Sequence, residues 1–195
     1  MVYYAYGELI GLFRVISVGN KADVDDADLI EYLDQDSATK IIAMYIEGIK
    51  DGKKFLSAAK KCGKPIVAIK AGRTAAGSAA ASTHTGSLSG SDAVYASAFK
   101  QVHIQRAYDV GELFDFARAL AYQPPANGNR VGIISNGGGA GIMTADWCES
   151  LGLNVTNITK KTADALKPHL PGITTARNPL DVTGDARFHR YHATG

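Results

Sequence analysis

The sequence predicts an α/β fold in which helices cover both faces of a parallel β-sheet. Short β-branched runs alternate with amphipathic helical patterns along the 195 residues, as in a chain of βα units. The predicted strands are apolar at consecutive positions, which is typical of strands that are buried on both faces. Because a helix separates successive strands, we expect those strands to run parallel.

The first part of the chain, residues 1–123, follows this pattern from its start. Residues 1–10 are typical of the second half of a helix, and the strand expected before it is not in the sequence. Residues 25–36 have acids in the first turn and Ile30 three positions before Leu33, which predicts a helix. The remaining predicted elements are strands at 13–19, 40–48, 65–72 and 103–108, and helices at 52–62, 91–102 and 110–122.

Prolines, a glycine and amides then interrupt the pattern, and they predict a linker at 124–129. The pattern restarts afterwards, with an irregular end expected at 171–195. Because a sheet has about five strands on average, we expect 130–195 to be part of a second α/β unit. The predicted elements of this unit are strands at 130–135 and 153–158, a glycine cluster at 136–141, and helices at 142–152 and 159–170.

Composition excludes several classes of protein. The 21 Lys and Arg residues nearly balance 19 Asp and Glu residues, so no excess charge favours a nucleic-acid or membrane surface. The apolar runs are strand-sized and too short to span a bilayer. The N-terminus lacks the pattern of a signal peptide, and the two cysteines lack the spacing of a metal site. We therefore expect a cytoplasmic protein with no metal site of its own.

The chain has 21 glycines, and a stretch rich in small residues at 70–99 is the first candidate site. It leaves the carboxyl end of a predicted strand and enters a helix near Ser91, where open α/β sheets bind ligands. Lys70 and Arg73 lie at the strand end, where they could meet phosphate charge. His84 lies in the middle. Composition alone fits a flexible linker with a solvated His84 equally well.

The turn at 135–147 is a second candidate phosphate site. Backbone amides of residues 136–140 can face one concavity in front of a helix N-terminus. The spacing matches neither a Walker A loop nor a complete GxGxxG motif. A tight turn that needs positive φ is the alternative, but it accounts for one glycine and hardly for three.

Glu47 lies at the carboxyl end of the predicted strand 40–48, on the sheet edge that also holds His84. A carboxylate there could bond one imidazole nitrogen and leave the other free to act as a nucleophile. The alternative is a solvated turn carboxylate. Asp181 and Asp185 could bind a metal or cap a turn, and the sequence favours capping.

Several runs together resemble the NDP-forming acyl-CoA synthetases, which include the ADP-forming acetyl-CoA synthetases and are related to succinyl-CoA synthetase. The resemblance extends in one order through nearly the whole chain, so it is more specific than any single motif. The runs are SVGNKADVD (17–25), YIEGIKDG (45–52), KPIVAIKAGRT (64–74), STHTGSLSGSD (82–92), NGGGAGIMTAD (136–146) and NPLDVTGDA (178–186).

The resemblance implies two flavodoxin-like ligase domains and a specific reaction. Acyl-CoA, ADP and phosphate would be interconverted with the free acid, CoA and ATP through an acyl phosphate and a phosphohistidine. His84 would carry the phosphoryl group, and Glu47 would orient it. Neighbouring backbone would bind the phosphate, at Thr85, Gly86, Ser87, Asn136, Gly137, Gly138 and Gly139.

The resemblance also implies partners that this sequence lacks. Full members carry a CoA-binding domain, a second phosphate-binding helix and ATP-grasp domains, and Mg²⁺ is expected with the nucleotide there. We therefore expect CoA or acyl-CoA, ADP or ATP, and phosphate as ligands. We also expect an oligomer that is not active as this chain alone.

Two other hypotheses remain at this point. One is a non-catalytic acyl-CoA-sensing domain of a protein acetyltransferase. His84 argues against it, because a sensing domain needs no nucleophile. The other is an inactive gene fragment whose unfinished sheets associate.

Overall fold

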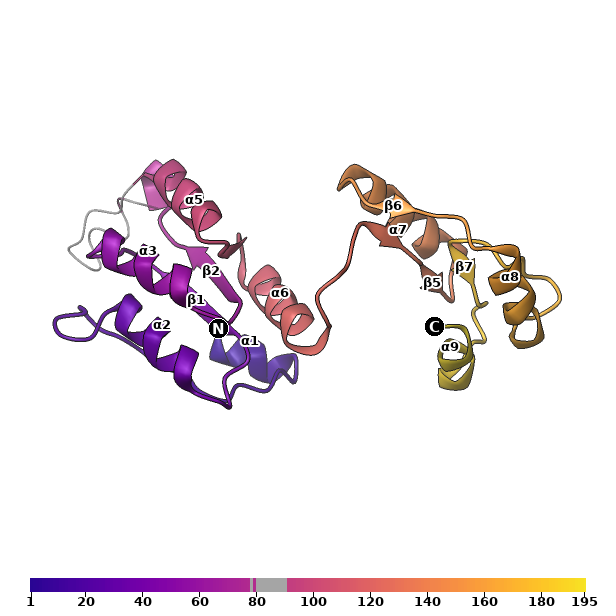
Figure 1. Ribbon diagram of the computed structural model, residues 1–195, viewed down its shortest axis with the longest axis horizontal. Helices are drawn as coiled ribbons and strands as arrows, with labels where there is room; N and C mark the ends of the chain where they lie inside the picture. The colour runs from indigo at the N-terminus through magenta and orange to yellow at the C-terminus, as the bar shows by residue number, and fades with distance from the viewer. Residues whose placement is uncertain (78, 80–90) are drawn as a thin grey trace. The chain divides into compact units, whose positions relative to one another are not determined.

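A parallel sheet in the order β1-β2-β3 is the centre of the first unit, residues 1–125 (Figure 1). The computed structural model describes residues 1–77, 79 and 91–195, and residues 126–195 form a second unit. The described elements of the first unit are α1 (Val2–Gly7), α2 (Asp26–Gln35), β1 (Ile42–Ile46), α3 (Gly52–Lys61), β2 (Ile66–Lys70), α5 (Asp92–Gln101), β3 (Gln105–Ala107) and α6 (Val110–Tyr122).

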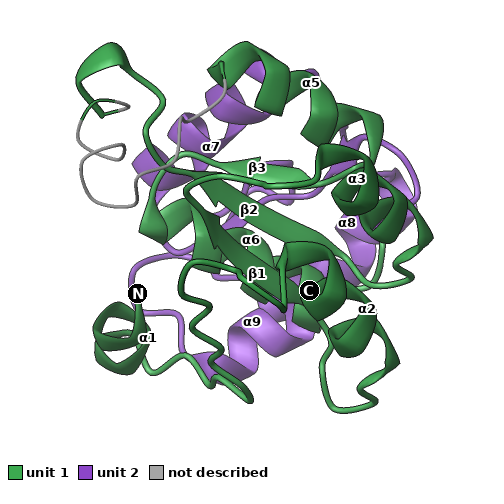
Figure 2. Cartoon of the chain, turned by 90° about the vertical axis from the view of Figure 1, so that its left-hand side faces the viewer, with its two compact units in different colours: residues 1–125 green, residues 126–195 purple. Residues whose placement is uncertain are grey.

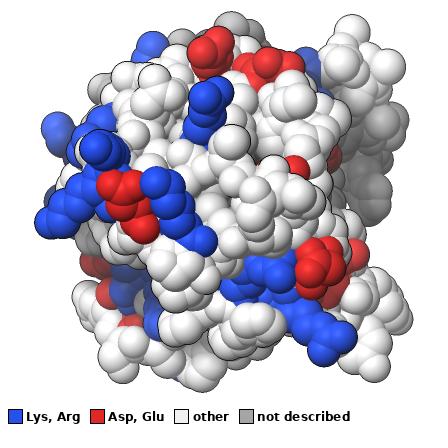
Figure 3. All heavy atoms as spheres, turned by 90° about the vertical axis from the view of Figure 1, so that its right-hand side faces the viewer, with Lys and Arg blue, Asp and Glu red and all other residues white. Residues whose placement is uncertain are grey.

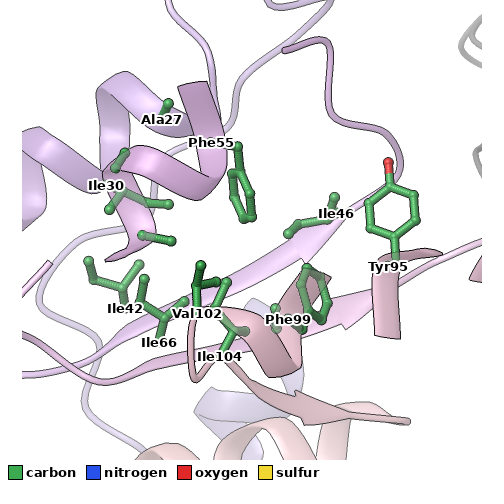
Figure 4. Close-up of a cluster of buried hydrophobic side chains, with 13 residues drawn as sticks. Ala27, Ile30, Ile42, Ile46, Phe55, Ile66, Tyr95, Phe99, Val102 and Ile104 are labelled. Carbon is green, nitrogen blue, oxygen red and sulfur yellow. The ribbon is translucent and has the colours of Figure 1, made fainter. Parts of the chain in front are cut away.

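Helices cover both faces of this sheet, as predicted. Helices α2, α3 and α5 lie on one face and α6 lies on the other (Figure 2). The central strand β2 is buried at all five positions. Its side chains alternate, so that Ile66 and Ala68 join the larger cluster shown in Figure 4, whereas Val67 and Ile69 pack with Leu113 of α6. The run of consecutive apolar residues in β2 therefore has the physical cause that the sequence indicated.

The starts of α2, α3 and α6 match their predicted positions to within one residue because local capping determines them. The Asp25 carboxylate accepts from the backbone N–H groups of Ala27 and Asp28, in a capping box at the start of α2. Asp51 caps α3 and Asp109 caps α6 in the same way.

The predicted strand at 13–19 is wrong. The structure shows no strand there, and Phe13 and Val15 are 64% and 62% exposed. Arg14 Nε donates to Asp36 Oδ2 at 2.9 Å, before β1, and Lys21 Nζ donates to Gly48 O at 2.8 Å, after β1. The segment is thus anchored at both ends. A strand also needs backbone hydrogen bonds to an adjacent strand, and no described strand pairs with these residues.

The second unit contains short parallel pairs, β4 with β6 and β5 with β7. The predicted strand 130–135 is interrupted at residues 132–133. There the side chain of Asn178 forms hydrogen bonds with the backbone in place of a neighbouring strand. Asn178 Oδ1 accepts from Ile133 N at 2.9 Å, and Nδ2 donates to Val131 O and Thr156 O. The elements are β4 (Arg130–Val131), β5 (Ile134–Ser135), α7 (Gly138–Ser150), β6 (Asn154–Val155), α8 (Lys160–Leu166), η1 (Lys167–His169), β7 (Leu180–Asp181) and α9 (Phe188–Thr194).

Three further sequence predictions for this unit need correction. Helix α7 begins at Gly138, so Gly138–Gly141 form its first turn and do not precede it. The predicted strand at 153–158 is reduced to β6. Residues 171–195 are not irregular throughout, because they contain β7 and α9. Strand β7 has two residues and depends on pairing with β5, and α9 has no side-chain cap, so neither has a strong local signal.

Removing the Asn178 side chain is expected to destabilise the second unit by about 2 kcal/mol, because Asn178→Ala leaves half-buried backbone groups of Val131, Ile133 and Thr156 without partners. Urea unfolding followed by a probe in this unit, such as the fluorescence of Trp147, measures the change. The control is Asn157→Ala, since Asn157 is exposed. Equal unfolding midpoints for the two variants would contradict this account of Asn178.

Charges of one sign do not cluster on the face shown in Figure 3. Lys and Arg lie beside Asp and Glu there, and most of the surface is uncharged. Within the described ranges 1–77, 79 and 91–195, no helix is long and apolar enough to cross a membrane.

Candidate functional site

The carboxyl ends of the three parallel strands in the first unit bring the sequence candidates Glu47 and Lys70 to one edge. Glu47 directly follows β1, Lys70 ends β2, and Tyr108 directly follows β3. The register pairs Ile46 with Lys70 and Ile69 with Ala107, so these strand ends are aligned. This is the edge where parallel α/β sheets bind ligands.

Lys70 is a buried cation at this edge, with 1% of its surface exposed. Its Nζ donates to the carbonyl of Ala71 and lies 4.8 Å from the centroid of the Tyr95 ring. Burial lowers the pKa of the Lys70 ammonium. The negative charges of Asp92 and Glu47 act in the opposite direction, and the positive charge of Arg106 lowers the pKa further. The pKa of Lys70 therefore depends on charges that follow β1, lie in β3 and begin α5.

The loop after Glu47 is fixed by side chains from distant parts of the unit. Lys21 Nζ donates to Gly48 O at 2.8 Å and also binds Asp26, at 2.7 Å from Oδ2. The backbone N–H of Ile49 donates to the Tyr95 hydroxyl at 3.0 Å. Glu47 itself is half-buried, and in the described part of the chain no group forms a hydrogen bond or ion pair with its carboxylate. A well-anchored backbone thus presents a carboxylate whose acceptor positions no described group occupies.

Arg106 and Asp92 were not singled out by sequence reasoning, although both lie at this edge. Arg106 of β3 forms an ion pair with Asp92, the first residue of α5. Arg73, which the sequence did indicate, is exposed and has its Cζ 5.0 Å from the ring centroid of Tyr108. An arginine inside the short run HIQRAY at a predicted strand end was the available signal for Arg106.

The glycine-rich turn of the second unit leads into an accessible helix N-terminus. Its glycines do not form a turn with positive φ. The N-cap Gly137 has φ −144°, and the described glycines with positive φ are Gly72, Gly128 and Gly152. A Cβ on Gly138 would lie 3.2 Å from Asp181 Oδ2, whereas Gly137 and Gly139 face open space. Gly138 therefore allows the end of β7 to approach closely. Gly137 and Gly139 leave the helix N-terminus accessible, at a place where an anion would be favourable.

Asp181 and Asp185 both bond to Thr183 in the turn between them, as the capping interpretation predicts, and Asp185 also forms an ion pair with Arg190 of α9. Asp181 Oδ1 accepts from the backbone N–H of Thr183 at 2.8 Å. Asp185 binds Arg190 at 2.9 Å and accepts from the Thr183 hydroxyl, and these bonds hold the pKa of its carboxyl well below the usual range.

The remaining sequence candidates, His84, Thr85, Gly86 and Ser87, lie outside the described residues. The described residues on either side of this stretch lie at the same edge of the sheet. Lys70 and Arg73 precede the stretch, and Asp92 follows it. Asn136 and Gly137–Gly139 belong to the second unit.

Comparison with known protein families gives a match in each unit. Residues 1–120 match the succinyl-CoA ligase-like flavodoxin domain, and residues 131–195 match the ligase-CoA domain.

Similar proteins match nearly the whole chain. Subunit alpha of the ADP-forming acetate–CoA ligase I of Pyrococcus furiosus is 49% identical over 94% of this chain and 40% of its own length. The ADP-forming acetate–CoA ligase of Methanocaldococcus jannaschii is 48% identical over 91% of this chain and 25% of its own length. This chain therefore spans less than half of either relative.

A solved structure agrees with the fold. It is the dinucleotide-forming acetyl-coenzyme A synthetase 1 of Ca. Korarchaeum cryptofilum in complex with phosphate and ADP, with a TM-score of 0.88 and 40% identity. The match covers 98% of this chain and 42% of that one.

Proposed function

The chain belongs to the succinyl-CoA ligase-like family that includes the ADP-forming acetate–CoA ligases, and from this premise we propose that it carries phosphate between an acyl group and a nucleotide in an ADP-forming acyl-CoA synthetase. The observation that carries the proposal is the carboxyl edge of the first sheet. There Glu47, Lys70 and the Arg106–Asp92 pair surround the start and end of the stretch that contains His84.

The proposal assigns each part of the chain a place in the enzyme. Residues 1–123 would form the ligase domain with the phosphorylated histidine, residues 124–129 a linker, and residues 130–195 part of the second ligase domain. In the second domain, the N-terminus of α7 would hold phosphate with the backbone of Asn136 and of Gly137–Gly139, next to the open space at Gly137 and Gly139. Thr85, Gly86 and Ser87 would do the same beside His84.

The chemistry assigned to His84 is a double phosphoryl transfer. In the first step a neutral imidazole nitrogen attacks the phosphorus of an acyl phosphate, a P–N bond forms, and the bond from phosphorus to the acyl oxygen breaks, so the carboxylate leaves. In the second step the terminal oxygen of ADP attacks the same phosphorus, and the P–N bond breaks to give ATP. Lys70 and Arg73 would offset the phosphate charge during both steps.

Other ligands follow from the same assignment. CoA or acyl-CoA and ADP or ATP would be bound by domains or subunits beyond this sequence, with Mg²⁺ accompanying the nucleotide. Within residues 1–77, 79 and 91–195, no group of three or more His, Cys, Asp or Glu residues is placed to hold a metal ion.

Phosphate labelling tests the proposal. The chain is incubated with labelled acetyl phosphate, and separately with labelled ATP, Mg²⁺ and the ATP-grasp protein that serves a related ligase. We expect one phosphate per chain, labile in acid and stable in base, which is removed by ADP. The related ligase's own histidine-bearing subunit serves as the positive control. A labelled control beside an unlabelled chain would overturn the proposal.

Replacing Glu47 by glutamine is expected to lower the rate of phosphorylation by about 100-fold, because the amide has no charge to orient the imidazole and to stabilise the positive charge that the ring gains as the P–N bond forms. Quenched-flow labelling measures the rate. Glu31→Gln is the matched control, since Glu31 is an exposed residue of α2 in the same unit. If Glu47→Gln is phosphorylated as fast as Glu31→Gln, Glu47 has no role in orienting the histidine.

A further inference from the structure

The backbone on both sides of Glu47 is held by hydrogen bonds from other elements. Before it, the carbonyl of Ile46 accepts from the backbone N–H of Ala71 at 2.9 Å, which continues the pairing of β1 with β2. After it, the backbone N–H of Ile49 donates to the hydroxyl of Tyr95 at 3.0 Å. The second of these bonds comes from a side chain, so a single substitution can remove it.

The position of the Tyr95 hydroxyl is determined by the core of the unit. Tyr95 is 9% exposed and belongs to the larger cluster of buried side chains. Its ring centroid lies 6.0 Å from that of Phe99, with the two planes at 78°. In Figure 4 the hydroxyl oxygen lies at the margin of this cluster and points away from the apolar side chains. Core packing therefore fixes the atom to which the loop after β1 is attached.

Tyr95 also lies close to the end of the stretch that contains His84. Its backbone N–H donates to the carbonyl of Ser91, the N-cap of α5, so Tyr95 lies in the first turn of that helix. Asp92, in the same turn, forms an ion pair with an arginine of β3, which joins the turn to the sheet. Tyr95 thus connects the loop of Glu47 with the helix that follows the His84 stretch.

We propose that Tyr95 is a positioning residue for the phosphorylation of His84. Its hydroxyl fixes the loop after β1, and the loop places the Glu47 carboxylate where it orients the imidazole. The inference rests on the proposed function and deepens it, because it adds a residue that contacts no reacting atom and acts through Glu47. Misplacing a positioned group by about 1 Å can cost about 100-fold in rate, so the loss of this anchor is measurable.

Replacing Tyr95 by phenylalanine tests the inference, because the ring and its packing remain while the hydrogen bond to Ile49 is lost. We expect the rate of phosphorylation at saturating acetyl phosphate to fall by about tenfold. The half-saturating concentration should stay within about twofold of the wild-type value, since Tyr95 makes no substrate contact. Quenched-flow labelling of the full chain over a range of acetyl phosphate concentrations measures both. Tyr32→Phe is the matched control, because Tyr32 is an exposed tyrosine of α2.

A double-mutant cycle distinguishes positioning from a general loss of stability. In the Glu47→Gln background, Tyr95→Phe should change the rate by less than about twofold, because the carboxylate that the hydroxyl positions is already absent. A further tenfold loss would overturn the inference. Val102→Ala removes buried atoms from the same cluster without a bond to the loop. It should be phosphorylated at the wild-type rate at a temperature where every variant is folded.

Hydrogen exchange of the Ile49 backbone N–H provides a measurement that does not depend on activity. It should be about tenfold faster in Tyr95→Phe than in Tyr32→Phe. Unchanged exchange, or a Tyr95→Phe variant that is phosphorylated as fast as Tyr32→Phe, would overturn this inference and leave the proposed function intact. A wild-type chain that takes no label would overturn the proposed function and this inference together.

Discussion

Replacing His84 by alanine is expected to abolish the acid-labile phosphate label on this chain. The proposed chemistry needs an uncharged nitrogen lone pair to attack phosphorus, and alanine offers none. Because a P–N bond hydrolyses in acid and a phosphate ester does not, the stability of the label reports which kind of atom carries it. Labelling with ATP and the ATP-grasp partner, followed by acid and base treatment, measures the effect.

The control for His84 is His189→Ala, an exposed histidine in α9. This variant should be labelled to the wild-type level. Acid-labile label that persists on His84→Ala would assign the phosphate to another residue and contradict the role of His84. If the label instead proves stable in acid, the nucleophile is not a histidine.

The largest loss of stability is expected for Phe99→Ala, at about 3–5 kcal/mol. Phe99 is 1% exposed in the larger core cluster, with its ring 6.4 Å from Phe55 and 6.0 Å from Tyr95, centroid to centroid (Figure 4). Alanine would remove apolar contacts and leave a cavity between α3, α5 and the sheet. Urea unfolding at constant pH measures the free energy of unfolding of the first unit.

Val94→Ala is the matched control on the same helix, because Val94 is 64% exposed. It should change the free energy of unfolding by no more than about 0.5 kcal/mol. A loss below about 1 kcal/mol for Phe99→Ala would show that α5 does not pack on the sheet as described.

Local signals explain which elements could be predicted. Helices α2, α3 and α6 each begin at an aspartate whose carboxylate caps backbone N–H groups, so a few adjacent residues determine their starts. Strand β2 was predictable because burial on both faces favours a run of consecutive apolar residues, as at positions 66–69. The segment 13–19 also contains β-branched apolar residues but has no described partner strand, so composition alone gave a wrong prediction there.

The sequence by itself determined the α/β class, most helices and strands of the first unit, and the edge where Glu47, Lys70 and Arg73 lie. The tertiary structure alone decided that Arg106 pairs with Asp92, that Lys21 and Tyr95 hold the loop after Glu47, and that Asp181 lies against Gly138. The physical reason is separation along the chain. Periodicity and caps act over a few residues, whereas these contacts join segments that only the packing of helices on the sheet brings together.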